Sequence, residues 1–146
     1  MTSVQVRARP VLGLLLLGGL AAAAGCGKEA AKGVPVSGKV TLDKKPLTTG
    51  RISLVPDVKK GNNANVACVG QLGTEGEFAI KVRGAQVPDN SPDVPLGWYK
   101  VIYLPARNAP APKIDPAFLT LENTPLSVEV VSDPKSGQYD FQFTSN

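Results

Sequence analysis

Apolar and polar residues alternate with a period of two along most of the chain after residue 33. In the first such run, valine and leucine side chains share one face, and Lys39 lies on the opposite face. Gly38 falls on the apolar face, which predicts a bulge or a close approach of another backbone. Period-two alternation is typical of half-buried β-strands. The runs that show it are residues 34–42, 51–56, 66–72, 78–82, 97–104, 126–130 and 139–143.

The segments between these runs carry turn and loop signals. We expect two local hairpins: residues 66–72 with 78–82, and residues 126–130 with 139–143. The remaining connections are longer. They are a polar loop over 57–65, a stretch rich in Pro and Asp over 84–95, and an irregular excursion over 105–125 with one helical turn within 114–121.

No segment after residue 26 keeps a helical spacing of apolar residues for three turns. Seven short strands, each with a single apolar face, can bury those faces by forming two sheets that pack against each other. The pattern therefore predicts an all-β fold, a single β-sandwich domain that spans residues 34–146.

The first 25 residues have the composition of an export signal. Residues 1–10 carry Arg7 and Arg9 and no acid, and an uncharged run of roughly 14 residues follows. That run is shorter than the roughly 20 residues that a spanning helix needs, which disfavours a transmembrane helix. Small residues then lead to a cysteine, which predicts cleavage between Gly25 and Cys26. The predicted division is a signal peptide at 1–25, a lipidated cysteine with a flexible tether at 26–33, and the domain.

Residues 23–26, Ala-Ala-Gly-Cys, resemble the lipobox of bacterial lipoproteins, although Ala23 stands where the family favours leucine. The resemblance implies a diacylglyceryl group on Cys26 and often a further acyl chain, such as palmitate, on its new amino group. Two or more acyl chains hold a protein firmly to a bilayer. We therefore expect membrane lipid as a partner, and a location at the bacterial cell envelope, on the periplasmic or outer side of a membrane. The alternative is an ordinary signal peptide with an incidental cysteine.

Charge argues against nucleic acid as a partner. The chain has 16 basic and 12 acidic residues. Removal of the signal segment takes away two arginines and no acid, so 14 basic residues remain against the same 12 acids. These basic residues are scattered rather than clustered, and a clustered basic face is the usual signature of nucleic-acid binding.

The residue types exclude much catalytic chemistry. The chain has no histidine, which removes histidine bases, Ser-His-Asp triads and the common zinc sites. Cys68 lies on the apolar side of its strand, which favours core packing over a reactive thiol. No Asp-x-Asp-x-Asp-Gly calcium loop is present. We expect no catalytic residue, no metal site and no cofactor, and hence a protein that is not an enzyme.

Two aromatic residues are the candidates for a binding surface. Trp98 and Tyr99 follow Gly97 in the segment with the strongest β-propensity. They could form an exposed platform, but packing in the core or across strands is the favoured interpretation.

Several motifs resemble the carboxypeptidase regulatory-like domains. Residues 36–47, with the order Gly-x-Val and then Lys-Pro-Leu, resemble the opening of that family, and residues 73–78 resemble its Thr-Asp-x-x-Gly-x-Phe turn, one residue shorter. Residues 96–101 resemble its later Gly-x-Tyr-x-Val strand. Together with the lipobox and the ending at 124–130 and 139–141, the layout is similar to small lipoproteins of planctomycete-type bacteria. The resemblance implies a transthyretin-like, seven-stranded Greek-key sandwich without established catalysis.

Two hypotheses for function remain. The first is a non-catalytic interaction or structural module that is tethered at the cell envelope, where its partner is an envelope protein or glycan. The alternative is a lipoprotein that binds a small ligand or a glycan with the long loops 57–65, 84–95 and 105–125, because loops on a rigid scaffold commonly carry function.

Overall fold

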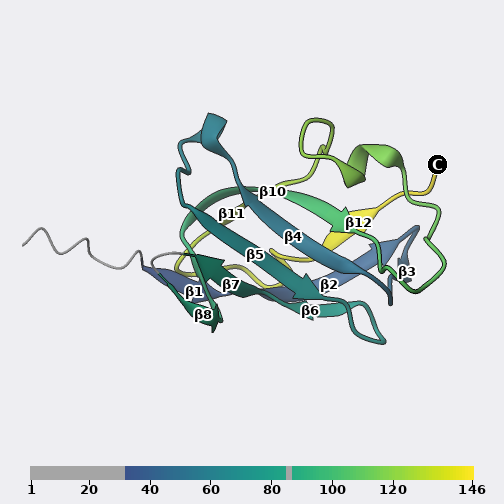
Figure 1. The fold of residues 1–146 in the computed structure, drawn as a ribbon, viewed down its shortest axis with the longest axis horizontal. Helices are drawn as coiled ribbons and strands as arrows, with labels where there is room; N and C mark the ends of the chain where they lie inside the picture. Colours follow the sequence, from purple (N-terminus) through teal and green to yellow (C-terminus); the bar gives the residue numbers. More distant parts are fainter. Residues whose placement is uncertain (1–31, 85–86) are drawn as a thin grey trace, which may run out of the picture.

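The computed structural model describes residues 32–84 and 87–146, and this part of the chain is all-β (Figure 1). Gly25 and Cys26, the predicted cleavage and lipidation sites, lie outside the described residues. The strands are β1 (Gly33–Pro35), β2 (Ser37–Leu42), β3 (Lys45–Pro46), β4 (Arg51–Pro56), β5 (Val66–Gln71), β6 (Glu77–Ala79), β7 (Lys81–Gly84), β8 (Val87–Ser91), β9 (Asp93–Pro95), β10 (Gly97–Leu104), β11 (Ser127–Val130) and β12 (Phe141–Phe143), with short 3-10 helices η1 (Val58–Lys60) and η2 (Pro116–Leu119).

Six of these strands form the large sheet, in the order β11-β10-β4-β5-β7-β8, and all neighbours in it are antiparallel. The alternation seen in the sequence gives this sheet one buried and one outer face. In β10, Tyr99, Val101 and Tyr103 are buried, and the residues between them are only partly buried. The outer face therefore carries the side chains of the opposite parity, such as Trp98 and Arg51.

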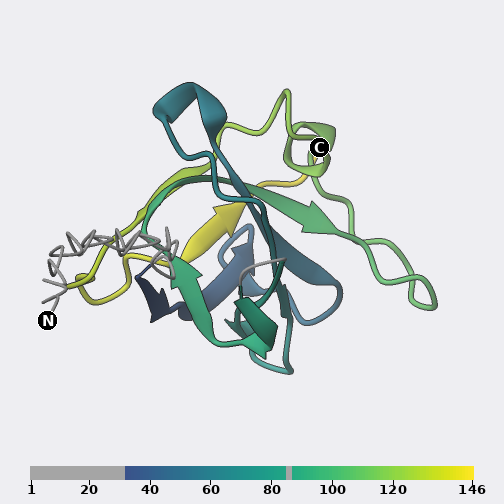
Figure 2. The same cartoon turned by 60° about the vertical axis from the view of Figure 1, so that its left-hand side comes forward.

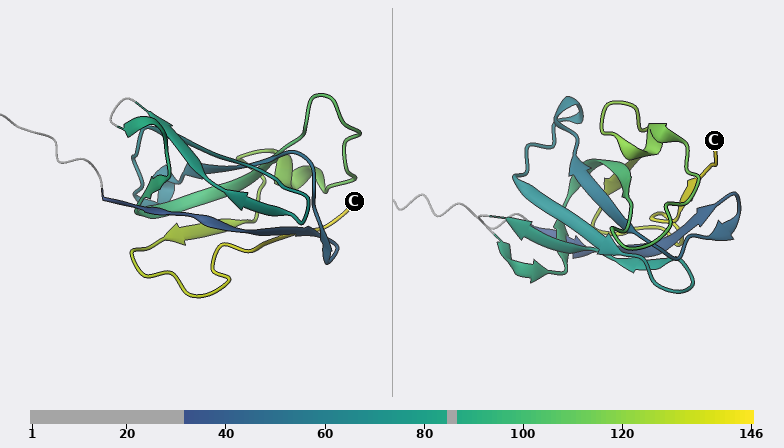
Figure 3. Two further views of the ribbon diagram at one scale, coloured as in Figure 1. Left: turned by 90° about the horizontal axis from the view of Figure 1, so that it is seen from below. Right: turned by 45° about the vertical axis from the view of Figure 1, so that its right-hand side comes forward.

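A second sheet lies across from the large one, so the layers have a sandwich-like arrangement (Figure 3). Its order is β12-β2-β3, and β6 pairs with β2 as well. β1 and β9 form a separate antiparallel pair. Strands β2 and β3 are joined by Asp43 and Lys44, which both have positive φ angles of 49° and 68°. Two such residues in succession define the type I′ turn that suits tight hairpins.

The core fills the space between the two sheets. Tyr103 of β10 meets Phe143 of β12 with ring centroids 6.1 Å apart, and Phe118 of η2 packs on the same ring at 4.9 Å. Burial of such large apolar side chains contributes roughly 1.5–3 kcal/mol each. The buried members of the core are Val36, Val40, Leu47, Ile52, Leu54, Cys68, Leu72, Phe78, Ile80, Val82, Val94, Tyr99, Val101, Tyr103, Ile114, Phe118, Val128, Val130, Tyr139, Phe141 and Phe143.

The predicted hairpin of residues 126–130 with 139–143 is wrong. β11 instead adds to β10 at the edge of the large sheet, and β12 pairs in parallel with β2 of the second sheet. Residues 131–140 cross from one layer to the other. This crossing segment is held at its end, where Lys39 N donates to Asp140 Oδ1 at 2.8 Å. A Cβ at Gly38 would overlap the carbonyl of Tyr139, so Gly38 marks the close backbone approach that its position predicted.

The predicted hairpin of residues 66–72 with 78–82 is correct only in part. β5 pairs with β7, but β6 belongs to the second sheet, where Phe78 lies opposite Gly38. The run changes layers at Ile80, whose N–H donates to Val36 O at 2.9 Å. A single alternating run can therefore serve two sheets, because its inward residues reach the same core from either one.

The connections also differ from expectation in one place. Residues 84–95, expected to be irregular, contain β8 and β9. β8 is an edge strand with mostly exposed side chains, so it lacks the apolar alternation that would reveal it. The excursion over 105–125 has no strand and contains one short 3-10 helix, in agreement with the sequence. In the described part of the chain, no helix has the length and apolar character needed to cross a bilayer.

Candidate functional site

The two predicted binding residues, Trp98 and Tyr99, project to opposite faces of the large sheet. The Tyr99 side chain is fully buried, and its hydroxyl donates to Pro95 O at 2.8 Å. Burial raises the pKa of the Tyr99 phenol to about 12. Tyr99 therefore lines no surface and packs in the core, as the favoured interpretation predicted, because β10 turns every second side chain inward. Only Trp98 lies on the outer face, where it is half-buried.

Trp98 lies beside a cleft that two of the three long loops form. η1 and residues near 121 stand on the same side of the molecule (Figure 2). The cleft between them has a volume of about 300 Å³. Segment 84–95, the third predicted ligand loop, does not contribute to it. The lining residues are Pro56, Asp57, Val58, Lys59, Lys100, Leu121 and Glu122.

Hydrogen bonds from Asp57 and Asn62 hold the η1 loop against β10. Asp57 is the N-cap of η1, and its Oδ1 accepts from Lys59 N at 3.1 Å. Gly61 ends η1 with a φ of 84°, which favours glycine. The buried Asn62 donates from Nδ2 to Trp98 O at 2.9 Å and accepts from Ala64 N at 3.1 Å. The loop therefore has a defined conformation set by its own polar residues.

Two lysines at this cleft, Lys60 and Lys100, are engaged in internal contacts. Lys60 Nζ lies 3.7 Å from the centroid of the Trp98 ring and donates to Ser127 Oγ at 2.9 Å. Lys100 Nζ donates to Leu121 O at 2.9 Å. These contacts join η1, β10 and the 105–125 excursion to each other. Their ammonium groups thus serve the architecture of the cleft.

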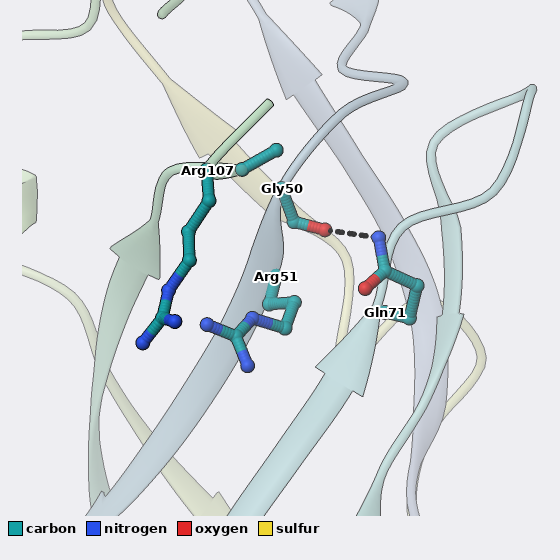
Figure 4. A pocket seen from close by; sticks show the side chains of 5 residues that line it. Gly50, Arg51, Gln71 and Arg107 are labelled. Carbon is teal, nitrogen blue, oxygen red and sulfur yellow. Dashed lines mark hydrogen bonds between the residues drawn. The ribbon is translucent and has the colours of Figure 1, made fainter. Parts of the chain in front are cut away.

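A second hollow lies where β4 begins and β10 ends, and it contains two arginines (Figure 4). Arg51 opens β4 opposite Leu104, the last residue of β10, and Arg107 follows three residues later. Both guanidinium groups face the same hollow in Figure 4, which has a volume of about 280 Å³. Its lining is completed by Gly50, Gln71 and Ala106 and contains no acidic residue.

The floor of this hollow is rigidly built. Gly50 is buried with a φ of 91°, and a Cβ there would overlap the ring and hydroxyl of Tyr103. Gly50 O accepts from Gln71 Nε2 at 2.8 Å and from Leu72 N at 3.1 Å. Tyr103 donates to Thr49 O at 3.0 Å. Glycine at position 50 therefore lets the backbone lie directly on Tyr103. This contact fixes the position from which the Arg51 side chain projects from the sheet.

A third hollow adjoins the second and shares Arg51 and Gln71 with it. It has a volume of about 380 Å³ and extends across the outer face of β5 and β7 to Asn90 of β8. Register explains its composition, since Ala67 pairs with Arg83 and Val69 pairs with Lys81. We call the two adjoining hollows the basic trough. It is lined by Gly50, Arg51, Ala67, Val69, Gln71, Lys81, Arg83, Asn90, Ala106 and Arg107.

Cys68 lies on the inner face of the sheet under the trough. It is fully buried and has no disulfide partner within the described residues. Burial raises the pKa of its thiol to about 12, so the reactive thiolate is scarce at neutral pH. This placement agrees with the expected core role. In the described ranges, no three His, Cys, Asp or Glu side chains are grouped so that they could hold a metal ion.

The basic trough was not anticipated from the sequence. Arg51 and Arg107 are far apart along the chain and become neighbours only because β10 pairs with β4. One signal was available: Lys81 and Arg83 alternate with the core residue Val82, as Arg51 does with Ile52. Strand parity could therefore place these cations on the outer face, but the sequence does not give the order of strands that gathers them. Comparisons with family models, curated proteins and solved structures found no match to this chain.

Proposed function

We propose that this chain is an exported, lipid-anchored protein of the bacterial cell envelope whose β-domain is a non-catalytic binding module. The observation that carries the binding role is the basic trough, in which Arg51, Lys81 and Arg83 lie on the outer face of the large sheet, Arg107 lies just beyond β10, and no acid is among the lining residues. Strands hold side chains in more precise positions than loops do, which suits a preorganised binding surface.

The proposal also includes the finer description of the fold. We propose a transthyretin-like, seven-stranded Greek-key framework made of β2, β4, β5, the β6–β7 run, β10, β11 and β12. Its support is the agreement between these strands and the seven alternating runs of the sequence, together with the two facing sheets. On this view, β1, β3, β8 and β9 are additions at the edges of that framework.

Anchoring through Cys26 is supported by the order of charged, apolar and small residues in the first 26 positions. From Cys26 to Gly33 the chain spans at most about 25 Å even when fully extended. The domain would therefore stay close to the bilayer. Figure 1 places β1, where the chain enters the domain, at the opposite end from the start of β4, which carries Arg51. The two-arginine end of the trough would then face away from the membrane.

The decisive experiment compares two cysteine substitutions in the full chain. The membrane fraction is isolated, and the intact mass and the N-terminal peptide are measured. We expect a chain that begins at Cys26 and carries diacylglycerol. Cys26→Ser should release the protein from the membrane, and Cys68→Ala should leave the anchoring unchanged. An N-terminus that retains residues 1–25 without any acyl mass would refute the anchoring.

Turnover of any compound in a hydrolase substrate panel, by the detergent-solubilised chain, would refute the non-catalytic role.

The cleft beside Trp98 supports the alternative of a small-ligand site at the loops. It brings together two of the three loops of that hypothesis, 57–65 and 105–125, and exposes apolar side chains at its rim, with Val58 68% and Leu121 37% exposed. Replacement of Val58 and Leu121 by serine should abolish binding of an apolar fluorescent probe at this cleft and leave ligands of the trough unaffected. Probe binding that survives the double substitution would exclude the cleft.

A further inference from the structure

The positive charge of the basic trough is not neutralised by any acidic residue in its own lining. Arg51, Arg107, Lys81 and Arg83 line its two hollows, and no Asp or Glu does. Bringing cations together costs electrostatic free energy, which an anion between them offsets. Arginine is the side chain best suited to grip a carboxylate or phosphate, because its planar fork forms two parallel hydrogen bonds. The trough therefore matches a ligand that carries negative charge.

The dimensions of the trough indicate an extended ligand rather than a single small anion. The cations stand on, or directly after, strands β10, β4 and β7, with β5 between the last two. Neighbouring strands lie about 4.8 Å apart, so the row of cations covers three steps, or roughly 14 Å. One phosphate or carboxylate group can contact only part of this row. A chain with repeated anionic groups can engage all of it.

The remaining polar groups of the trough can form hydrogen bonds with sugar hydroxyls. Gln71 uses Nε2 for Gly50 O, and Asn90 uses Oδ1 to accept from Arg83 at 3.1 Å and 3.3 Å. The other amide atoms, Gln71 Oε1 and Asn90 Nδ2, can accept from or donate to hydroxyl groups along the chain of a ligand. Side-chain amides next to arginines can therefore bind both the hydroxyl groups and the carboxylate group of an acidic sugar.

The same lining argues against the competing classes of polyanion. It contains no Phe, Tyr or Trp, on which the bases of a single-stranded nucleic acid would stack. For a lipid surface, the start of β4, which carries Arg51, lies at the opposite end of the domain from β1 (Figure 1), so a bilayer near β1 would not contact the arginine pair of the trough.

We propose that the basic trough binds a linear anionic glycan, with its carboxylate groups paired to Arg51 and Arg107 and its neighbouring sugars lying over Gln71 and toward Lys81 and Arg83. This inference rests on the proposed function, since it names the ligand class of that binding module.

The test uses the full chain in a neutral detergent and polygalacturonate, a linear polymer of carboxylated sugars, as the probe. The control ligand is its fully methyl-esterified form, which has the same backbone without the charges. We expect binding to polygalacturonate that weakens as the salt concentration is raised. Binding to the ester should be weaker by a factor of about ten or more. Equal binding to both polymers would overturn the proposal, as would a lack of binding to polygalacturonate.

Variants of the protein localise the contact. Arg51→Gln and Arg107→Gln should each weaken binding about tenfold. The matching lysine substitutions should weaken it less, because lysine keeps the positive charge and loses only the two parallel hydrogen bonds of the guanidinium group. Lys135→Gln is the matched control, since it removes one exposed cation on the crossing segment outside the trough. Because all of these side chains are exposed, we expect every variant to fold with the melting temperature of the unsubstituted protein, and measuring that temperature checks it. Affinity that responds equally to the control and to the arginine variants would overturn the site.

Competing ligands decide the class. Vesicles of phosphatidylglycerol and a single-stranded oligothymidylate are added in separate titrations. The proposal requires both to bind more weakly than polygalacturonate, and stronger binding of either would replace the glycan with that class. If every polyanion fails while the N-terminal mass still shows an acylated Cys26, the ligand assignment is wrong but the anchoring part of the proposed function stands.

Discussion

The cleft beside Trp98 and the basic trough both lie on the outer side of the large sheet, and they use their cations in different ways. In the cleft, Lys60 and Lys100 donate to Ser127 and to Leu121, and Lys60 also covers the Trp98 ring. Asp57 and Glu122 add negative charge to its lining. In the trough, Arg51 and Arg107 face an open hollow with no acid in its wall.

This difference separates cations that stabilise the fold from cations that are available to a ligand. A lysine that donates to a carbonyl and covers an indole is already engaged, and its removal alters the protein itself. An arginine that faces a hollow without a carboxylate has its hydrogen-bonding groups turned toward whatever enters. The cations of the two regions should therefore respond in opposite ways to substitution, with losses of stability at the cleft and losses of binding at the trough.

The largest effect is expected from the glycine in the floor of the trough. Gly50 and Gly61 both have positive φ angles, of 91° and 84°, but a Cβ at position 50 overlaps Tyr103, whereas one at position 61 meets no atom within 4 Å. Gly50→Ala should cost about 3 kcal/mol of unfolding free energy through overpacking and strain. Gly61→Ala should cost about 1 kcal/mol through backbone strain alone. Chemical denaturation of both variants measures the difference, and equal losses would contradict the rigid floor.

Alkaline pH should destabilise the protein through the tyrosines under the two regions. Burial raises the pKa of Tyr99 to about 12 and also raises the pKa of Tyr103, from an ordinary value of 10. The neutral phenols are therefore favoured in the folded state. Their contribution to stability is complete below pH 10 and is lost as the pH rises from 10 toward about 12. Denaturation curves between about pH 8 and about pH 11, with tyrosinate absorbance, measure this loss.

The matched variants for this effect are Tyr99→Phe and Tyr103→Phe. They are compared in a Cys68→Ala background, since burial also raises the pKa of Cys68 to about 12 from 9. Tyr99→Phe should remove more of the alkaline sensitivity than Tyr103→Phe. If tyrosinate forms fully near pH 10 while the circular dichroism remains native, the phenols are not buried as described.

The N-cap of η1 should contribute a moderate amount of stability at the cleft. Asp57 accepts from Lys59 N, and Asp57→Ala leaves that donor without its cap, at a cost of about 1 kcal/mol. The emission of Trp98 should shift at the same time, because the loop lies against it. Asp89→Ala, which removes an exposed acid from the edge strand β8, is the control and should change neither quantity. A wild-type denaturation midpoint for Asp57→Ala would show that the cap is dispensable.

The smallest effect is expected from single cations. Lys60→Met removes the contact with the Trp98 ring and should lower stability by about 0.5 kcal/mol, with a change in tryptophan fluorescence. Arg107→Met should leave stability unchanged. A loss of stability at Arg107 that equals the loss at Lys60 would abolish the distinction between the two regions.

The sequence predicted which residues face the core better than it predicted which strands are neighbours. Parity alone placed Val36, Cys68 and Val82 inside, because a period of two maps directly onto the two faces of a strand. Parity does not encode the partner of a strand. Residues 126–130 and 139–143 looked like a hairpin, yet they close two different sheets, since each finds a free edge with matching backbone positions.

The candidate sites show the same limit. The loops 57–65 and 105–125 were predicted as ligand loops, and the structure brings them together at one cleft. The trough depends on strand order and on the pairing of Arg51 with Leu104, which are properties of the assembled sheet. Edge strand β8 escaped prediction for a related reason, because backbone hydrogen bonds to β7 hold it in place while most of its side chains are exposed.

The parallel pairing of β12 with β2 has a consequence for when the domain can fold. Val40 pairs with Phe141, and Lys39 N donates to the carboxylate of Asp140, which lies 101 positions downstream. Neither contact can form before these later residues are synthesised. Contacts between such distant segments form slowly, because a long loop must close before they yield any free energy. A nascent chain that emerges with its amino end first would thus lack one wall of its interior until β12 is synthesised.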